Sequence, residues 1–317
     1  MRWFRKVSAE LVPAQPEAAP AASLLGGRYR LSRSLGRGAS SEVLLAIDTH
    51  SGQRVAVKLM SAGQSGTPLG YSSSALISSN RETQAAARLN HVGIARVIDV
   101  DPAHPPGWLV MELAYGMPLS RYTQPSRLLP EVLVFQIGAR IAEALAHAHA
   151  QGVVHRDLKP ANVLVDLPNL SVKLLDFGVA RIDDGQQTRT GMTVGTPAYM
   201  APEQLAGQAA TPASDVYALG VMLFELLTGR RPHEAASLGE LLRAVAHKPA
   251  AELAPLRPDL PPTAVQGVQQ ALATNPAKRP QDLVAYAADL SDLATAVSLR
   301  GPRNGGALTN AVQSPTA

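Results

Sequence analysis

The stretch SLGRGASSEV, residues 34–43, carries two glycines one residue apart and lies between two segments with the character of β-strands. RYRLSRSLG leads into it, EVLLAID leads out of it, and QRVAVKLM predicts a third strand. The polar turn THSG, which contains Gly52, suits a hairpin between the second and third strands. We therefore expect the glycine loop to join one strand directly to the next.

A loop between two strands excludes two classes of phosphate-binding fold. A dinucleotide-binding fingerprint opens a helix directly after its glycines, and the pyrophosphate lies on the N-terminus of that helix. A Walker A loop ends in Gly-Lys-Ser/Thr, whereas this loop ends in Ser-Ser-Glu. Ser41 also occupies the place where a third glycine would complete the pattern G-x-G-x-x-G. The glycines therefore belong to a different kind of loop.

The composition limits the classes of protein to which the chain can belong. With 317 residues, 46% of them hydrophobic, the chain can bury a large core and exceeds the usual size of one domain, so we expect two lobes. It has no cysteine, which excludes disulfides, thiolate metal sites, iron–sulfur clusters and a thiol nucleophile, and which fits a reducing compartment. Three positive charges of the net +4 are Arg2, Arg5 and Lys6, so the chain lacks the basic footprint of a nucleic-acid-binding protein.

The sequence predicts a cytoplasmic protein without a transmembrane segment. The most apolar window, residues 216–229, is shorter than the roughly 18–20 residues that span a bilayer and contains Glu225, so we interpret it as a buried helix. The first residues, MRWFRKV, lack the apolar run of a signal peptide, and weak contact with a membrane surface is the alternative to a disordered basic tail. We expect residues 1–27, basic and Pro/Ala-rich, and residues 296–317, polar and Gly/Pro-interrupted, to be disordered.

The pattern of the chain changes from strands to helices. After Lys58, a Ser/Gly-rich connection leads to NRETQAAARLN, whose alanines and leucine favour a helix. IARVIDV and GWLVMEL predict a strand pair that closes a small sheet, and the apolar residues of PEVLVFQIGARIAEALAHAHAQG follow helical spacing. We expect one folded unit over residues 28–295, with a sheet-based lobe at about 28–111 and a helical lobe at about 115–295.

Two polar segments bounded by apolar runs carry the chemically interesting acids. VVHRDLKPANVLV, residues 153–165, contains Asp157, Lys159 and Asn162, and its apolar ends would anchor it as a loop between buried elements. Asp176 emerges from a second apolar run, in LLDFGVAR. Two acids on rigid stems near one another favour a magnesium site.

Five motifs occur in a fixed order along the chain: the glycine loop, VAVK, HRDLKPAN, DFG and GTPAYMAPE. In this order the chain resembles the protein-kinase family, and it looks like a bacterial serine/threonine kinase of the eukaryotic-like, or Hanks, type. The resemblance covers roughly residues 28–295. It implies an α+β bilobal fold with a small antiparallel-sheet N-lobe, which has one main helix, and a larger, mostly helical C-lobe. The cofactors that it implies are ATP and Mg²⁺ or Mn²⁺.

The resemblance also implies an ATP site between the lobes. Gly36 and Gly38 would let the loop backbone approach the phosphates, and the backbone of residues 112–114 would bind the adenine edge. Ser41 departs from the three-glycine pattern, but its hydroxyl and N–H can still donate to a phosphate, so we expect function to survive. The implied ATP-binding set is Leu35, Gly36, Arg37, Gly38, Ala39, Ser40, Ser41, Val43, Ala56, Lys58, Met111, Glu112, Leu113 and Leu164.

Lys58 is expected to pair with the α- and β-phosphates and with a glutamate from the first long helix. Glu82 is the only acid between Lys58 and Asp99, so it is the candidate for that glutamate. An alternative remains open, because Ser79-x-x-Glu82 also spells a capping box at the start of a helix.

The resemblance assigns the remaining catalytic roles within HRDLKPAN and DFG. Asp157 would accept or orient the proton of the substrate hydroxyl, and Lys159 would neutralise the transferred phosphoryl group. Asn162 and Asp176 would hold the metal ions. Lys159, two residues after the catalytic aspartate, and Thr196 of GTPAYMAPE both favour Ser/Thr over Tyr specificity.

Arg156, directly before the catalytic aspartate, implies regulation by phosphorylation of the activation loop, because a buried arginine takes an anionic partner. Thr188 and Thr190 stand where similar bacterial kinases autophosphorylate, and Thr193 is a third candidate. The alternative for any one of these threonines is an ordinary polar loop residue.

Other matched positions are expected to be architectural. Glu203 should pair with Arg279, and Asp215 should brace the catalytic loop. His155 should pack near Phe177.

Two further histidines, His147 and His149, have alanine neighbours and no partner pattern, so we interpret them as surface or packed residues and not as metal ligands. No metal other than magnesium or manganese is implied.

Three other functions compete with an active protein kinase. A catalytically silent, nucleotide-binding scaffold would lack Lys58, Asp157 or Asp176, and the sequence retains all three. A small-molecule kinase would not need the peptide-docking segment GTPAYMAPE, which argues for protein substrates. An adapter function of the tails would be an additional role. The expected partners are protein substrates and a second copy of the chain for trans-autophosphorylation, with no nucleic acid.

Overall fold

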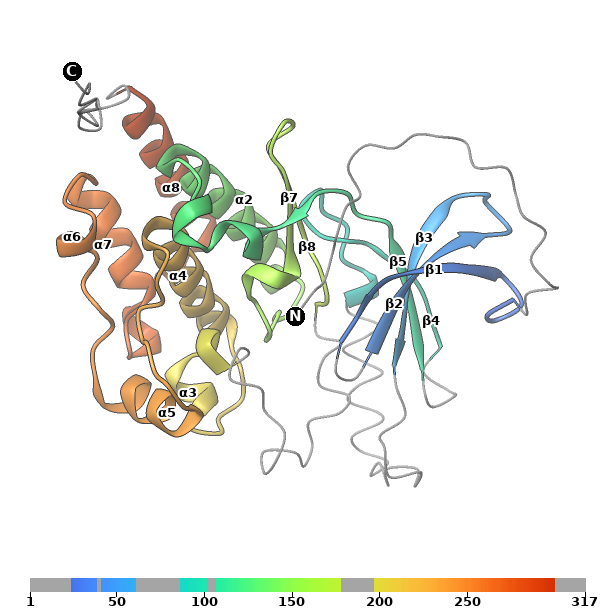
Figure 1. Ribbon diagram of the computed structural model, residues 1–317, viewed down its shortest axis with the longest axis horizontal. Helices are drawn as coiled ribbons and strands as arrows, with labels where there is room; N and C mark the ends of the chain where they lie inside the picture. Colours follow the sequence, from blue (N-terminus) through green and yellow to red (C-terminus); the bar gives the residue numbers. More distant parts are fainter. Residues whose placement is uncertain (1–23, 39–40, 61–85, 102–106, 178–196, 300–317) are drawn as a thin grey trace, which may run out of the picture.

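The computed structural model describes residues 24–38, 41–60, 86–101, 107–177 and 197–299. They form two lobes that lie side by side, a β-sheet lobe built from the first part of the chain and a mainly helical lobe built from the second (Figure 1). This is the bilobal α+β architecture that the sequence predicts.

The first lobe is a five-stranded antiparallel sheet. Its strands are β1 (Tyr29–Arg37), β2 (Ser41–Asp48), β3 (Arg54–Met60), β4 (Val97–Asp101) and β5 (Trp108–Glu112), in the spatial order β1-β2-β3-β5-β4. The glycine loop connects β1 to β2, so the prediction of a strand-to-strand loop is confirmed.

Both faces of this sheet are apolar, because side chains alternate between faces along each strand. One face packs Tyr29, Ala46, Val55, Val57 and Val110 together. The other face groups Ala56, Leu109 and Met111 with partly buried neighbours from β1 and β2. Two separate clusters therefore flank the sheet, and the second contains several residues of the implied ATP site.

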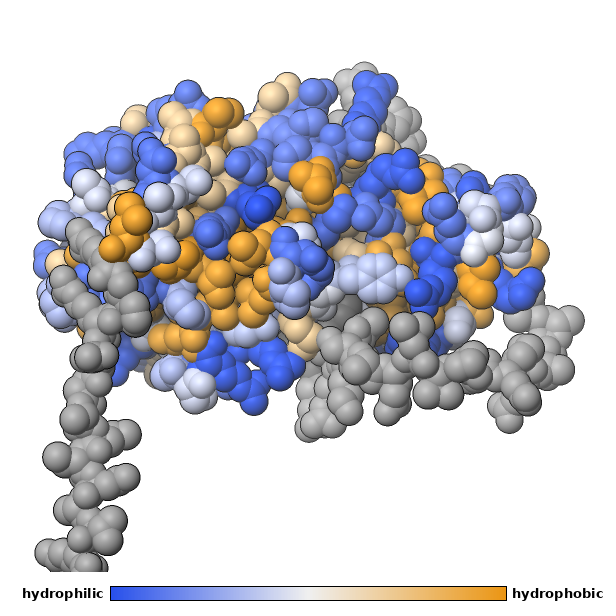
Figure 2. All heavy atoms as spheres, turned by 90° about the horizontal axis from the view of Figure 1, so that it is seen from above, coloured by the Kyte–Doolittle hydropathy of each residue, from blue (hydrophilic) through white to orange (hydrophobic). Residues whose placement is uncertain are grey.

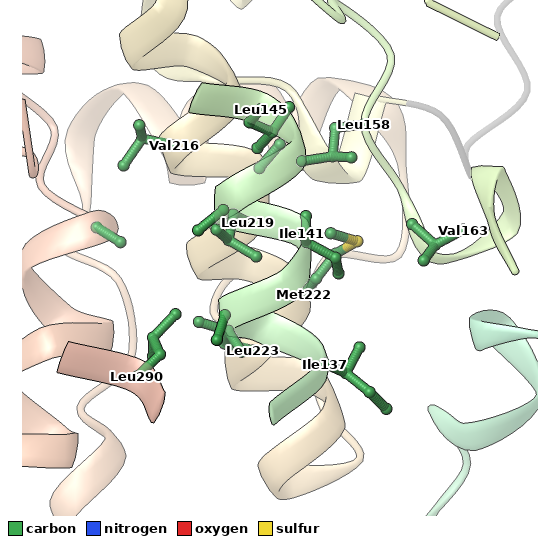
Figure 3. Packing of buried hydrophobic residues seen from close by; sticks show 14 of the residues in the cluster. Ile137, Ile141, Leu145, Leu158, Val163, Val216, Leu219, Met222, Leu223 and Leu290 are labelled. Atoms are coloured by element: carbon green, nitrogen blue, oxygen red, sulfur yellow. The ribbon is translucent and has the colours of Figure 1, made fainter. Parts of the chain in front are cut away.

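The core of the second lobe is made by three long helices, α2 (Glu131–Ala150), α4 (Pro212–Thr228) and α8 (Leu283–Leu299). Figure 3 shows Ile141 of α2 among Leu219 and Met222 of α4, in a cluster that also includes Leu290 of α8. Shorter elements complete the lobe: α3 (Pro202–Leu205), α5 (Leu238–His247), α6 (Leu253–Leu256), α7 (Pro262–Ala271) and the 3₁₀ turns η1 (Leu119–Tyr122), η2 (Pro125–Arg127), η3 (Pro160–Asn162), η5 (Pro197–Tyr199) and η6 (Pro276–Lys278).

Helix α4 confirms the interpretation of the most apolar window as a buried helix, since every residue from Ser214 to Leu227 is buried. Ser214 Oγ accepts a hydrogen bond from the Thr211 backbone N–H at the start of the helix. Gly229 ends it in the left-handed conformation with φ of 72°, which glycine adopts without a steric penalty.

A small second sheet lies between the five-stranded sheet and the helices of the second lobe (Figure 1). It consists of β6 (Met117–Pro118), β7 (Val163–Asp166) and β8 (Ser171–Leu174), paired antiparallel in the order β6-β7-β8. Because β7 follows HRDLKPAN and β8 precedes DFG, this hairpin positions both of those polar segments.

The two lobes are also joined by backbone hydrogen bonds away from the chain connection. The Leu174 N–H donates to Gly93 O at 2.8 Å, and the Ala95 N–H donates to Leu174 O at 2.9 Å. The segment that leads into β4 is therefore held against β8 of the second lobe.

The domain boundaries differ from the expected ones at both ends. Leu25 forms an isolated bridge with Tyr29 and packs against the first-lobe core, so the first lobe includes described residues before 28. Helix α8 continues past residue 295 to Leu299, because Val297 extends its buried apolar face. Of the helix predicted from NRETQAAARLN, the structure describes only the last turn, where residues 86 and 87 are helical.

Among the described residues, none of the helices is long and apolar enough to cross a membrane. On the face shown in Figure 2, hydrophilic residues surround smaller groups of hydrophobic ones, as on most water-exposed protein surfaces.

Candidate active site

The loop between α2 and β7 brings Asp157, Lys159 and Asn162 into direct contact. Lys159 Nζ lies 2.6 Å from Asp157 Oδ2, and Asn162 Nδ2 donates to the same oxygen at 3.0 Å. Asn162 Nδ2 also donates to the Asp157 backbone oxygen at 2.8 Å. The neighbouring Leu158 is buried in the second-lobe core and anchors the loop. The three residues predicted to act in phosphoryl transfer thus form one hydrogen-bonded group.

Asp215 of α4 braces this loop, as the sequence predicts. Its Oδ2 accepts the His155 N–H at 2.8 Å, and its Oδ1 accepts the Arg156 N–H at 3.0 Å. Arg156 has a φ of 71°, a left-handed conformation that costs a non-glycine residue roughly 1–2 kcal/mol. The two hydrogen bonds help to offset this cost and fix the backbone directly before Asp157.

His149 has a role that the sequence analysis missed. Its Nε2 lies 2.8 Å from Asp215 Oδ2, and its side chain is largely buried. From the sequence, His149 was interpreted as a surface or packed residue, and no partner was predicted for it. Asp215 is 66 positions further along the chain, and no local sequence pattern links the two residues. His147, by contrast, stacks on His91 with ring centroids 5.1 Å apart. Within the described part of the chain, no three His, Asp or Glu side chains cluster as a metal site.

A cation from the first lobe and a carboxylate from the second are in contact where the two lobes meet. Lys58 of β3 is buried, and its Nζ lies 2.9 Å from Asp176 Oδ1, just after β8. Asp176 also has a left-handed backbone, with φ of 62°. The Leu175 N–H donates to Asn162 O at 2.9 Å, which places the segment that leads into Asp176 beside Asn162.

Several residues of the implied ATP-binding set gather in one apolar cluster on the sheet. Ala56 of β3 and Met111 of β5 are buried there, with Leu35, Val43 and Leu113 packed against them. These residues come from four segments of the chain that the sheet brings together into one apolar surface.

The glycine loop itself is partly described. Gly36 is the register partner of Val43, and the Gly38 N–H donates to the Ser41 backbone oxygen at 2.7 Å. Arg37 pairs with Glu42 across the loop, with Nη2 3.0 Å from Oε2.

Leu164, on β7, is buried in the second lobe. Seven predicted residues lie outside the described residues: Ala39, Ser40, Glu82, Thr188, Thr190, Thr193 and Thr196.

Two architectural predictions are confirmed. Arg279 Nη1 and Nη2 lie 2.7 Å and 2.8 Å from the two carboxylate oxygens of Glu203. Burial favours the neutral acid, but the hydrogen bonds from Arg279 and Ser214 outweigh it and lower the pKa of Glu203. The ring of His155 packs on Phe177 at a centroid distance of 4.6 Å.

The oxygen atoms of Asn162 and Asp176 fit a divalent cation of the magnesium class. Carboxylate and amide oxygens are the ligands that such cations prefer. Asn162 commits its Nδ2 to Asp157, which leaves the amide Oδ1 for a cation. The backbone bond from Leu175 to Asn162 brings the segment that leads into the Asp176 carboxylate beside it. The arrangement can bind a metal–phosphate group near Lys58.

Comparison with known proteins agrees with this geometry. Residues 29–289 match the family model described as the protein kinase domain. The chain is 40% identical over 263 residues to serine/threonine-protein kinase PknA of Mycobacterium tuberculosis, covering 80% of this chain and 58% of the relative. It is 37% identical over 266 residues to serine/threonine-protein kinase Pkn1 of Myxococcus xanthus, covering 81% of this chain and 36% of the relative.

A further relative is serine/threonine-protein kinase PknB of Mycolicibacterium smegmatis, with 37% identity over 278 residues, 84% of this chain and 43% of the relative. The matched region thus spans about 36–58% of the length of these curated relatives. Together with the fold and the arrangement of Lys58, Asp157, Asn162 and Asp176, these matches show that the chain belongs to the protein kinase family, among the Hanks-type serine/threonine kinases of bacteria.

Proposed function

We propose that this chain is an ATP-dependent serine/threonine protein kinase that transfers the γ-phosphoryl group to serine or threonine hydroxyls of proteins. The main support for this proposal is the set of contacts that brings four charged or polar residues together. Lys58 from the first lobe contacts Asp176 of the second, and Asn162 links the Asp176 segment to the group around Asp157. The charges that phosphoryl transfer needs are therefore assembled at one place.

Each residue of this group has a distinct role in the proposal. Asp157 accepts or orients the proton of the substrate hydroxyl through its carboxylate. Lys159, 2.6 Å from that carboxylate, is placed to neutralise the charge of the transferred phosphoryl group. Lys58 exchanges its contact with Asp176 for the α- and β-phosphates when nucleotide binds.

Asn162 and Asp176 would hold the metal ion through Oδ1 and the carboxylate. Bound magnesium or manganese supplies positive charge to the phosphate oxygens. The apolar cluster around Ala56 and Met111 would bury the adenine ring, and the backbone of residues 112–114 would hydrogen-bond its edge.

The regulatory part of the proposal concerns the activation loop. Thr188, Thr190 and Thr193 are the proposed sites of autophosphorylation, with a second copy of the chain as the partner in trans. Arg156 would then bind the phosphothreonine, because a phosphate offers it charge-assisted hydrogen bonds. Glu82 is the proposed partner of Lys58 in the active state. We place the enzyme in the cytoplasm, where ATP is available and a cysteine-free chain needs no oxidising environment.

The test is phosphorylation of the purified protein during incubation with ATP and either Mg²⁺ or Mn²⁺, followed by intact-mass and peptide analysis. Asp157→Asn and Lys58→Met are the inactive variants, and each should reduce phosphate incorporation at least about 100-fold. Arg257→Met is the control, since Arg257 forms ion pairs with Glu131 and Asp259 in the helical lobe, away from the cleft. Phosphate on Thr188, Thr190 or Thr193 in the wild type and the control alone supports the proposal. Equal incorporation in Asp157→Asn contradicts it.

A further inference from the structure

An ion pair outside the catalytic group joins the two lobes. Lys173 of β8 places Nζ 2.6 Å from Glu112 Oε1, at the end of β5. Both side chains are only partly exposed, at 21% and 35%. Lys173 belongs to the hairpin of the second lobe, whereas Glu112 closes the sheet of the first. The pair, here named the hinge latch, therefore crosses from one lobe to the other.

Hydrogen bonds tie the hinge latch to a third segment, the one that leads into β4. Lys173 Nζ donates to Ile94 O at 3.3 Å, and Glu112 Oε2 accepts the Arg96 N–H at 3.2 Å. The Glu112 N–H in turn donates to Arg96 O at 2.8 Å. The latch thus has backbone support on both of its sides, which limits the freedom of the two side chains.

The latch connects the two ends of the proposed nucleotide site. Glu112 begins the backbone stretch proposed to bind adenine, and Lys173 precedes the metal-binding Asp176 by three residues on the same short strand and loop. A second ion pair between the lobes, Lys58 with Asp176, lies inside the proposed nucleotide site. This contact must break when Lys58 binds phosphate and Asp176 binds the metal ion. The latch uses no atom assigned to the nucleotide, so it can persist while the nucleotide is bound.

We propose that Lys173 is a positioning residue, which acts through Glu112 to hold the adenine-binding backbone in register with Asp176. The inference rests on the proposed nucleotide site. In physical terms, the latch lowers the free-energy cost of holding the adenine-binding backbone and Asp176 in the relative position that one ligand needs when it binds both. A ligand that binds only the adenine-binding backbone should therefore have the same affinity with or without the latch.

The experiment measures binding by calorimetry for two probes, adenosine and a non-hydrolysable ATP analogue with Mg²⁺. The variants are Lys173→Met, Glu112→Gln, both together, and the reversed pair Lys173→Glu with Glu112→Lys. Arg257→Met is the matched control, because the Arg257–Glu131 pair has the same exposed fractions, 21% and 35%, and lies in the helical lobe.

We expect each single variant to weaken binding of the ATP analogue about three- to fivefold, the range of a partly exposed ion pair. Lys173→Met, which lies outside the proposed nucleotide site, should leave adenosine affinity within about 1.5-fold. The double variant should be no weaker than the single ones, and the reversed pair should regain at least half of the loss. For Lys173→Met, KM for ATP should rise in parallel while kcat stays within about twofold.

Three results would overturn the proposal. The first is analogue affinity in Lys173→Met equal to that of the control. The second is an equal loss of adenosine and analogue affinity, which indicates general damage to the fold. The third is a higher kcat in the single variants, which would mean that the pair restrains the enzyme. Because binding is measured without turnover, a wild type that binds nucleotide but transfers no phosphate refutes the proposed function and still decides the role of the latch.

Discussion

His149 Nε2 lies 2.8 Å from Asp215 Oδ2, so a side-chain contact joins helices α2 and α4 next to the loop that carries Asp157. The same carboxylate holds the backbone N–H groups of His155 and Arg156. The orientation of Asp215 is thus determined from both sides, by a helix and by the catalytic loop.

Replacing His149 by phenylalanine is therefore expected to lower kcat. The ring volume is nearly kept, but Asp215 loses one of its three partners and the backbone before Asp157 gains freedom. A small misplacement of catalytic groups is costly, so we expect a fall in kcat of about tenfold, with KM for ATP within about twofold. Steady-state kinetics measure both. His147→Phe is the control, since His147 stacks on His91 and does not contact Asp215. An unchanged kcat in His149→Phe would disprove the coupling.

Replacing Arg279 by methionine is expected to destabilise the second lobe strongly. The Arg279 side chain is fully buried and serves both oxygens of Glu203, so its loss leaves a buried carboxylate without its cation. Breaking a buried pair in this way costs about 3–5 kcal/mol. Chemical denaturation measures the loss, and Arg37→Met, at the exposed Arg37–Glu42 pair, should cost less than about 1 kcal/mol. Similar losses in the two variants would refute the argument.

The same pair predicts a dependence of stability on pH. Hydrogen bonds from Arg279 and Ser214 hold the folded-state pKa of Glu203 below its ordinary value of 4.5, against the effect of burial. A carboxyl with a lowered folded pKa contributes stability above the unfolded value and loses it as the pH falls through the folded value. The stability difference between the wild type and Glu203→Gln should therefore be largest above about pH 5 and shrink in more acidic buffer.

Glu225→Gln is expected to act in the opposite direction. Burial raises the pKa of Glu225 above 4.5, although the hydrogen bond from the Tyr199 hydroxyl, 2.6 Å from Oε2, works against this. Because the folded pKa exceeds the unfolded one, the ionised carboxylate penalises the folded state increasingly as pH rises through that value. The amide avoids this penalty, so the variant should be more stable than the wild type near pH 8 and lose the advantage near pH 4.

Leu170→Gly tests the turn between β7 and β8. Leu170 has a φ of 49°, which costs a side-chain-bearing residue roughly 1–2 kcal/mol, whereas glycine avoids that cost at an entropic penalty of roughly 0.5–1 kcal/mol. The matched variant is Leu170→Ala, which removes the same leucine atoms but keeps the left-handed strain. In thermal denaturation, the glycine variant should be more stable than the alanine variant by up to about 1 kcal/mol. The reverse order would show that the backbone is not strained there.

The sequence predicted the residues whose chemistry demands a fixed spacing. Asp157, Lys159 and Asn162 lie within six positions of one another, and the order of motifs assigned both Lys58 and Asp176 to the implied ATP site. The ion pair between Lys58 and Asp176 was not predicted. The strand-to-strand glycine loop was predicted for a similar reason, because turns and short strands leave local signals.

Two further side-chain pairs between residues that are far apart in the sequence were not predicted. His149 with Asp215 and Lys173 with Glu112 join residues that are 66 and 61 positions apart, and neither pair belongs to a periodic pattern. The extension of α8 beyond residue 295 was missed because a helix end depends on what its last apolar residue, Val297, can pack against.

The complete burial of α4 from Ser214 to Leu227 has a consequence for how this lobe responds to thermal fluctuations. Its amide protons can reach water only when the surrounding helices separate, since no side of the helix is open to local fraying. Asp215, which braces the catalytic loop, stands on this helix. The loop that carries Asp157 is therefore braced from a helix whose amide protons should exchange slowly, and its geometry should outlast the loosening of peripheral elements as the temperature rises.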